Sequence, residues 1–217
     1  MAQHPARMSA TTDEPIVFVV DDDQDFRDSL AALFNSIGLK VSTFSSATEF
    51  LRNKLPDVAS CLVLDVRLPS LSGLDLQGEL AKANISIPII FVTGHGDIPM
   101  TVKAMKAGAA DFLPKPFREQ DMLDAVGSAL ERDRKRREIE RRLAVLRSRL
   151  QDLTPREREV MNLVTAGLMN KQIAGKLDVT EVTVKTHRGQ VMRKMGARSL
   201  ADLVKIAEAL GIDPPST

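Results

Sequence analysis

Three consecutive carboxylates, those of Asp21, Asp22 and Asp23, follow directly on the apolar run "IVFVV". Like charges a few ångströms apart repel one another, and partial burial at a strand end increases the repulsion. A positive partner is therefore expected among them. Asp65 ends a second apolar run, in "CLVLDV", and Lys115 follows a third apolar stretch, in "FLPKPF". Carboxylate oxygens grouped beside a lysine suit the binding of a hard divalent cation.

Short apolar runs rich in β-branched residues must position these side chains. Five strands are expected, at 16–20, 61–66 and 88–93 and, with weaker patterns, at 40–44 and 109–113. Near-continuous apolar runs are typical of parallel strands that are covered on both faces. Helical patterns separate them, at 25–37, 46–54, 73–83, 98–107 and 119–130. This alternation predicts an α/β doubly wound domain with a five-stranded parallel sheet.

The polar candidates all follow strands of this predicted sheet. In doubly wound sheets, ligands bind beyond the carboxyl ends of the strands. Asp21, Asp22, Asp65 and Thr93 fall at such ends, and Lys115 follows the last strand. We expect these five side chains to converge on one edge of the sheet. The alternative for Asp65 is a carboxylate that only caps the end of a strand.

The chain changes character after residue 130. Residues 131–142, "ERDRKRREIERR", are charged almost throughout. Apolar residues then recur at spacings of 4, 3, 4 and 3, at Ile139, Leu143, Leu146, Leu150 and Leu153. This pattern is a short a/d seam on a helix. It predicts either a solvated linker helix with one apolar side or a linker helix that pairs with its twin in a dimer.

A new helical pattern begins at "LTPRERE", where Thr154, Pro155 and Glu157 form a capping box with proline at the first helical position. Three more helices are expected, at 170–177 capped by Asn170, at 181–195 capped by Thr180, and at 199–210. A tight turn before the third of four short helices is typical of a helix-turn-helix. The second half therefore predicts an all-α four-helix domain.

The helix expected at 181–195 has two distinct faces at 100° per residue. Val184, Val191 and Met195 share one face, with His187 beside them, and would pack in the core. The opposite face holds Lys185, Thr186, Gly189, Gln190 and Arg193. Such a face can enter a DNA major groove, although a solvated basic surface is the alternative. Glycine costs roughly 1 kcal/mol in a helix relative to alanine, so Gly189 indicates a close approach to another backbone.

Charge is divided unevenly along the 217 residues. Residues 13–130 hold 17 acidic and 10 basic residues, a net charge of −7, and residues 131–217 hold 12 acidic and 19 basic residues, a net charge of +7. An acidic half joined to a basic half indicates two domains with different partners, the basic one suited to a polyanion. One cysteine, no apolar run of membrane-spanning length and no secretory signal predict a soluble, cytoplasmic protein without a membrane partner.

Two long motifs resemble one known family. "LTPREREVMNLVTAGLMNKQIAGKLDVTEVTVKTH" is similar to the DNA-binding domain of the LuxR/NarL/FixJ transcription regulators, and the match extends over some 55 residues. The first half resembles response-regulator receiver domains, and "GHGDIPMTVKAMKAGAADFLPKPF" is especially similar to the FixJ subgroup. The resemblance implies a flexible tail at 1–14, a receiver domain at 15–130, a helical linker at 131–152 and a LuxR-type helix-turn-helix DNA-binding domain at 153–217.

The resemblance implies a role for each matched residue of the receiver. Asp65 would accept a phosphoryl group from a sensor histidine kinase. Mg²⁺ (or Mn²⁺) would be bound by Asp22, Asp65 and the backbone carbonyl of Arg67, with Asp21 acting through a water. Thr93 and Lys115 would hold the phosphoryl oxygens, and Phe112 would swing inward on activation. In this family the Lys115–Pro116 peptide bond is typically cis.

The same resemblance implies a transcription regulator of a two-component system that phosphorylation switches on. The surface of 98–107, 109–113 and 119–130 would form a homodimer that binds double-stranded promoter DNA and works with RNA polymerase. The candidate DNA contacts are Lys185, Thr186, Arg188, Gly189, Gln190 and Arg193. Gly189 stands where several relatives have a basic residue. The protein would not be an enzyme, apart from catalysing its own phosphoryl transfer and autodephosphorylation.

Two functions of other classes would fit part of the pattern. A Mg²⁺-dependent phosphatase with an aspartyl nucleophile also pairs carboxylates at strand ends, but it usually has a second acid two residues after the nucleophile, where this chain has Arg67. A binding module with an unphosphorylated receiver would regulate through protein contacts alone. A phosphorylation assay separates this last function from a phosphorylated switch.

Overall fold

The chain divides into two units, the first ending at Arg137 and the second beginning at Glu138. A computed structural model describes residues 14–69, 71–94 and 98–212. The tail expected at 1–14 lies outside these residues except for Glu14, whose carboxylate pairs with Lys40 at 2.7 Å. None of the helices in the described part of the chain combines the length and the apolar character that crossing a membrane requires.

The first unit is built on a parallel sheet with the strand order β2-β1-β3-β4-β5. Its strands are β1 (Ile16–Val20), β2 (Lys40–Phe44), β3 (Ser60–Asp65), β4 (Ile89–Thr93) and β5 (Asp111–Pro114). The two strands with the weaker sequence patterns, β2 and β5, are the edge strands, which are only partly buried. The α/β doubly wound, five-stranded parallel fold expected from the sequence is confirmed.

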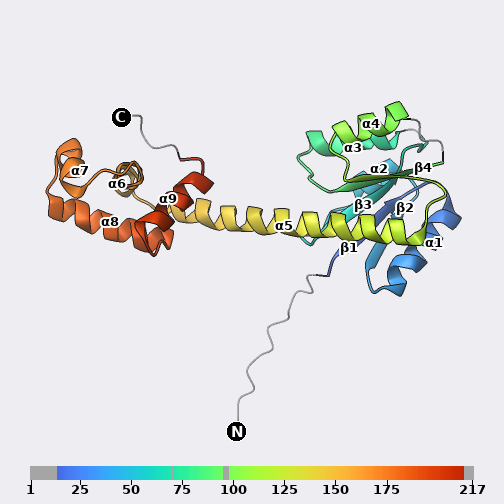
Figure 1. The fold of residues 1–217 in the computed structure, drawn as a ribbon, viewed down its shortest axis with the longest axis horizontal. Coiled ribbons are helices and arrows are strands. Elements are labelled where there is room, and N and C mark those ends of the chain that lie inside the picture. Colours follow the sequence, from blue (N-terminus) through green and yellow to red (C-terminus); the bar gives the residue numbers. More distant parts are fainter. Residues whose placement is uncertain (1–13, 70, 95–97, 213–217) are drawn as a thin grey trace, which may run out of the picture. The chain divides into compact units, whose positions relative to one another are not determined.

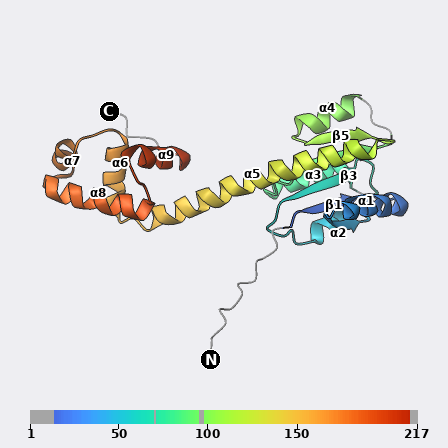
Figure 2. The same cartoon turned by 60° about the horizontal axis from the view of Figure 1, so that its bottom comes forward.

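Helices cover both faces of this sheet (Figures 1 and 2). The helices of the first unit are α1 (Gln24–Ser36), α2 (Ala47–Arg52), α3 (Gly73–Lys82), α4 (Ile98–Lys106) and the first part of α5 (Glu119–Gln151). Phe18 and Val20 of β1 pack in one core cluster with α2, α3 and α4, whereas Val17 and Val19 pack in another with α1 and α5. Successive strand residues face opposite sides, so β1 contributes to both clusters.

One continuous helix, α5, occupies the stretch in which the sequence pattern indicates a fifth helix followed by a linker. Its first turns bury Met122, Val126 and Leu130 against the sheet. Between Leu130 and Gln151 the sequence has no glycine or proline, and Glu131 pairs with basic residues three and four positions later. Nothing local therefore ends the helix there.

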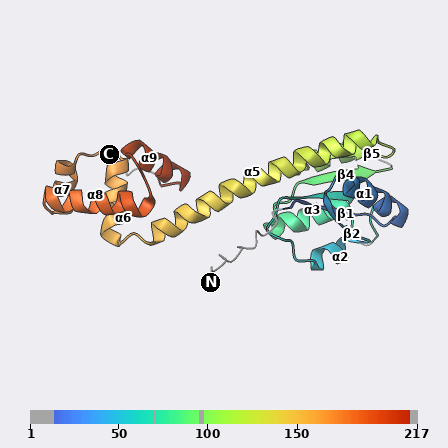
Figure 3. The same cartoon turned by 90° about the horizontal axis from the view of Figure 1, so that it is seen from below.

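The second unit contains α6 (Pro155–Thr165), α7 (Asn170–Leu177), α8 (Glu181–Met195) and α9 (Leu200–Ala209), arranged as in Figure 3. The four helices enclose a core that includes Val160, Ile173, Val191 and Leu203. The four-helix domain expected from the sequence is confirmed, as are the capping box at Thr154 and the cap at Thr180.

The structure differs from two local expectations in this unit. The N-cap of α7 is Met169, whose backbone N–H donates to the side chain of Gln172, so the prediction of Asn170 as the cap is wrong by one residue. The apolar seam expected along the linker is divided. Leu150 and Leu153 pack in the core of the second unit, whereas Ile139 remains 58% exposed.

Candidate functional site

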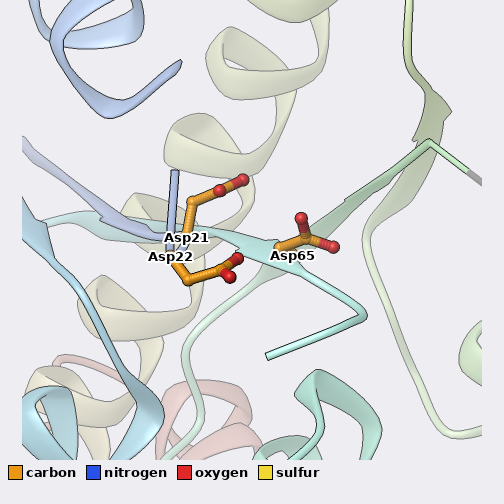
Figure 4. A group of neighbouring side chains, drawn as sticks. All are labelled: Asp21, Asp22 and Asp65. Atoms are coloured by element: carbon orange, nitrogen blue, oxygen red, sulfur yellow. The ribbon is translucent and has the colours of Figure 1, made fainter. Parts of the chain in front are cut away.

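Three carboxylates meet at the carboxyl ends of β1 and β3 (Figure 4). Asp21 and Asp22 follow β1, and Asp65 is the last residue of β3. The two strands are hydrogen-bonded neighbours in the sheet, so their ends lie side by side. One oxygen atom of each carboxylate lies within 4.8 Å of those of the other two. The convergence follows from parallel strand ends meeting at one edge of the sheet.

Lys115 supplies the positive partner that the carboxylates require. It follows β5, and its backbone N–H donates to the carbonyl of Thr93, the last residue of β4, at 2.8 Å. Its Nζ donates to Oδ2 of Asp21 at 2.7 Å and to Oδ2 of Asp65 at 3.1 Å. The ammonium group therefore lies between the two carboxylates and reduces their mutual repulsion.

Burial and charge shift the protonation of this pair. Burial raises the pKa of the Asp21 carboxyl above its ordinary value, while the hydrogen bond from Lys115 opposes that rise. Burial also works to lower the pKa of Lys115, but the hydrogen bond to Asp21 and the charges of Asp21 and Asp65 outweigh it, so this pKa lies above its ordinary value. Lys115 thus keeps its positive charge at neutral pH.

The two central carboxylates differ in the access they offer. Asp21 is fully buried, and its Oδ1 accepts the N–H of Asp23 at 2.9 Å while its Oδ2 accepts Lys115. Asp65 keeps a small exposed surface, and its Oδ1 accepts the N–H of Arg67 at 2.9 Å. Asp22 is exposed. Asp22 and Asp65 can therefore be approached from solvent, whereas Asp21 is enclosed.

The residues present fit a small, hard divalent cation. The donor set consists of carboxylate oxygens, the ligands that Mg²⁺ prefers, and Lys115 bonds to only two of the three carboxylates, those of Asp21 and Asp65. Figure 4 shows the carboxylate of Asp22 directed toward that of Asp65. The hydrogen bond from Arg67 to Asp65 also brings the backbone of Arg67 to this edge.

Thr93 and Phe112 lie on the neighbouring strands β4 and β5, with Thr93 level with Pro114 and Phe112 level with Phe91. Thr93 ends β4 and is buried. Phe112 lies in β5 and is half-buried, with its ring centroid 6.4 Å from that of Phe91. The Lys115–Pro116 peptide bond is cis. The structure thus brings Asp21, Asp22, Asp65, Thr93 and Lys115 to one end of the sheet, whereas Phe112 lies further back in β5, level with Phe91.

Several residues that support the site were not anticipated from the sequence. Arg27, in α1, donates from Nη1 to the backbone carbonyl of Asp21 at 2.5 Å. The Nζ of Lys115 lies 3.6 Å from the ring centroid of Phe26, a cation–π contact. Gly73 begins α3 so close to the carbonyl of Asp65 that an added Cβ would overlap it. Among these supporting residues, only Gly73 could have been noticed in the sequence, as a glycine at the start of a helix.

In the second unit, α8 buries Val184, Val191 and Met195 as its core face, as expected, while His187 is half-buried. Four of the candidate DNA contacts are exposed, namely Lys185, Thr186, Gly189 and Arg193. Gln190 is half-buried and accepts a hydrogen bond from Arg193. The exposed set therefore lies on the face of α8 opposite the core.

Arg188 lies apart from this exposed face. It is half-buried, and its Nη1 donates to Oδ1 of Asn170, in α7, at 3.0 Å. This bond joins the two helices of the helix-turn-helix and gives Asn170 a role other than that of a cap. No described atom lies within 4 Å of a Cβ added at Gly189, so none of the residues that the structure describes makes the close backbone approach expected there.

Comparison with known protein families gives two matches. Residues 17–127 match the family described as "Response regulator receiver domain", and residues 151–207 match "Bacterial regulatory proteins, luxR family". The two matched segments contain the carboxylate cluster and the helix-turn-helix, respectively.

Individual proteins match over nearly the whole chain. Nodulation protein W of Bradyrhizobium diazoefficiens is 63% identical over 202 residues, which cover 93% of this chain and 89% of that protein. Transcriptional regulatory protein FixJ of Rhizobium meliloti is 44% identical over 199 residues, which cover 91% of this chain and 97% of that protein. The solved structure of response regulator StyR is 50% identical, covers 90% of this chain and 98% of its own, and has a TM-score of 0.82.

Proposed function

The chain belongs to the response regulators that join a receiver domain to a LuxR-family DNA-binding domain, and on this premise we propose that Asp65 accepts a phosphoryl group. Such proteins are two-component, DNA-binding regulators of transcription, and those of the FixJ type are among the relatives of this chain. A receiver domain implies a sensor histidine kinase as the donor.

The observation that carries this proposal is the position of Lys115 between Asp21 and Asp65, with Asp22 beside them. An ionised carboxylate is a competent nucleophile toward phosphorus. It can approach an anionic phosphoryl group only where positive charge stabilises both, and the ammonium of Lys115 already lies 3.1 Å from Asp65. Asp65 is thus the accessible carboxylate next to a fixed cation.

The divalent cation of the proposed reaction is Mg²⁺ or Mn²⁺. Asp22, Asp65 and the backbone carbonyl of Arg67 would bind it directly. Asp21, whose carboxylate is completely buried, would contribute through a water. The cation would supply positive charge to the transferred group.

The chain would catalyse only its own phosphoryl transfer and autodephosphorylation, since the position two residues after Asp65 is Arg67 and not a second acid.

In the proposed switch, Thr93 and Lys115 hold the phosphoryl oxygens and Phe112 turns inward. Phosphorylation can shift the population only through contacts that one state makes better than the other, and these are the new contacts to Thr93 and Lys115. The surface of α4, β5 and the first part of α5 would then form a homodimer. Three exposed apolar residues of α4 support such an interface, namely Ile98, Val102 and Met105.

The output of the switch is binding to double-stranded promoter DNA in the cytoplasm, with RNA polymerase as the further partner. A dimer would place two copies of α8 on paired half-sites. The exposed face of α8, with Lys185 and Arg193, suits the contacts to phosphates and base edges.

The test compares wild type with Asp65→Asn, with and without acetyl phosphate and Mg²⁺, by sedimentation and by gel shift on DNA. Only wild type should gain mass and DNA affinity. Asp28→Asn, which changes an exposed aspartate in α1, is the control and should behave as wild type. Equal DNA binding by wild type and Asp65→Asn under both conditions would contradict the phosphorylation switch.

A further inference from the structure

Three residues of α8 form a line on its exposed face. Val182, Thr186 and Gly189 follow one another at spacings of four and three residues, which place them on the same side of a helix. All three are exposed, on the side opposite Val184 and Val191, which lie in the core. We call these three residues the methyl stripe.

Val182 is the most apolar member of the methyl stripe. Its side chain is 75% exposed in the first turn of α8 and therefore adds little to the core of the second unit. Its apolar surface is available to whatever α8 contacts. Single exposed apolar residues are common, so the neighbours of Val182 must decide whether this surface has a role.

Thr186 extends this apolar surface. Its Oγ1 donates to the backbone carbonyl of Val182 at 3.0 Å, so the hydroxyl hydrogen is used within the helix. The group that Thr186 chiefly offers to a partner is then its methyl. Val182 and Thr186 together present methyl groups one turn apart on α8.

Gly189 is the third residue of the line, and because it has no side chain it forms a notch in this face of α8. Its φ is not positive, and an added Cβ would meet no described atom within 4 Å, so neither the backbone nor the packing of the described chain requires glycine. Glycine also lowers helix stability relative to alanine. A partner that must come close to the backbone of α8 gives a physical reason for glycine at this position.

We propose that the methyl stripe recognises the C5-methyl groups of thymines in the major groove, an inference that rests on the proposed DNA-binding function. Thymine is the base that presents a methyl in this groove, and apolar side-chain groups are its usual contacts. Lys185 and Arg193 flank the stripe and suit contacts to phosphates or guanines. The notch at Gly189 lets the helix approach closely enough for Val182 and Thr186 to reach the methyls.

The experiment uses a duplex selected from a random DNA library with the full chain, acetyl phosphate and Mg²⁺. Each thymine of that duplex is then replaced by deoxyuridine, which removes only the C5-methyl group. Wild type should lose affinity about three- to fivefold at one or two positions in each half-site, the effect expected from one buried methyl.

Two variants test which side chains meet those methyls. For each of the variants Val182→Ser and Thr186→Ser, replacing thymine by deoxyuridine at one of the sensitive positions should no longer change the DNA affinity. Thr186→Ser keeps the hydroxyl that bonds to the carbonyl of Val182 and removes only the methyl. The control is Val145→Ser, which changes a 52% exposed valine of α5 and should keep the thymine preference of wild type.

Gly189→Ala tests the close approach. It should raise the thermal stability of the second unit and yet weaken binding to the selected duplex several-fold. Gly78→Ala changes a glycine of α3 that also has no atom within 4 Å of an added Cβ, and it should leave DNA affinity unchanged. Unchanged affinity of Gly189→Ala would overturn this part of the inference.

The outcomes separate this inference from the function on which it rests. If wild type selects no duplex, the proposed DNA-binding function fails, and the inference fails with it. If wild type binds a duplex but tolerates deoxyuridine at every position, or if Val182→Ser and Thr186→Ser keep the full thymine preference, the methyl stripe is overturned and the DNA-binding function stands.

Discussion

The carboxylate of Asp133 accepts a hydrogen bond at 2.9 Å from the backbone N–H of Ser60, so α5 is attached to the first residue of β3. Asp133 is completely buried, and it also accepts hydrogen bonds from Arg136 at 2.6 Å and from Arg137 at 2.7 Å. Arg137 reaches further, to Asp57, at 2.7 Å. A buried carboxylate with this many donors holds the middle of α5 to the receiver domain.

Replacing Asp133 by alanine should destabilise the receiver domain by about 3–5 kcal/mol, because it removes the carboxylate that accepts the buried N–H of Ser60 and the hydrogen bonds of Arg136 and Arg137. Urea unfolding followed by circular dichroism measures this change. Glu131→Ala removes two exposed ion pairs on the same helix and should change the free energy of unfolding by no more than about 1 kcal/mol. Equal effects of the two substitutions would show that the Asp133 network adds no stability.

Adding Mg²⁺ should raise the melting temperature of wild type, because a ligand that binds only the folded state stabilises it. Asp22→Asn should remove most of this rise. Without Mg²⁺ the same variant should melt at the wild-type temperature or above it, since one like charge has left the cluster. Thermal unfolding with and without Mg²⁺ measures both effects, and a full Mg²⁺ response in Asp22→Asn would count against Asp22 as a ligand.

The DNA-binding domain should lose stability in acid through Glu157. The hydrogen bond from Lys194, at 2.7 Å, and that from the backbone of Thr154 lower the pKa of Glu157 below its ordinary value. A carboxyl whose pKa is lower in the folded state contributes stability above its unfolded pKa, near 4.5, and loses it as the pH falls toward the folded value.

Glu157→Gln should therefore cost about 1–3 kcal/mol of unfolding free energy at pH 7 and much less at pH 3. Chemical denaturation of this domain across that range is the measurement. Glu159→Gln is the matched control, because Glu159 lies on the same helix and its side chain is 52% exposed in its ion pair with Arg156. A constant difference between wild type and Glu157→Gln at every pH would disprove the linkage.

Gly196→Ala should destabilise the DNA-binding domain more than Gly167→Ala does. Both glycines end helices with positive φ, +71° and +85°, where alanine is strained by about 1–2 kcal/mol. Only at Gly196 would the added methyl also meet the guanidinium of Arg149, which donates to the carbonyl of Met195 at 3.0 Å. Equal losses in denaturant midpoint would show that the Arg149 contact contributes nothing.

Much of the fold was predictable because its signals are local. β-branched apolar runs identify the central strands, and parallel strand order brings their carboxyl ends to one edge. Asp21, Asp22 and Asp65 could therefore be grouped from the sequence. The DNA-binding helices were predictable from caps such as Thr154 and Thr180, whose side chains bond to backbone N–H groups close by.

The long-range contacts were not predictable. Asp133 is one acidic residue in a run of charges, and only the packing of α5 shows that it alone is buried there. Arg27 likewise looks like an exposed helix residue, yet it bonds to the carbonyl of Asp21. Leu150 and Leu153 fit a seam along the linker equally well, and their place in the core of the second unit depends on how the helices pack.

The attachment of α5 at Asp133 has a consequence for the exchange of output domains between regulators. A fusion made at residue 131 would separate Asp133, Arg136 and Arg137 from the strand and the loop that they hold. A fusion point between Glu138 and Leu146 would leave those contacts with the receiver domain, and Arg149, Leu150 and Leu153 with the DNA-binding domain. A fusion junction in that short, solvated stretch of α5 therefore keeps both the receiver domain and the DNA-binding domain intact.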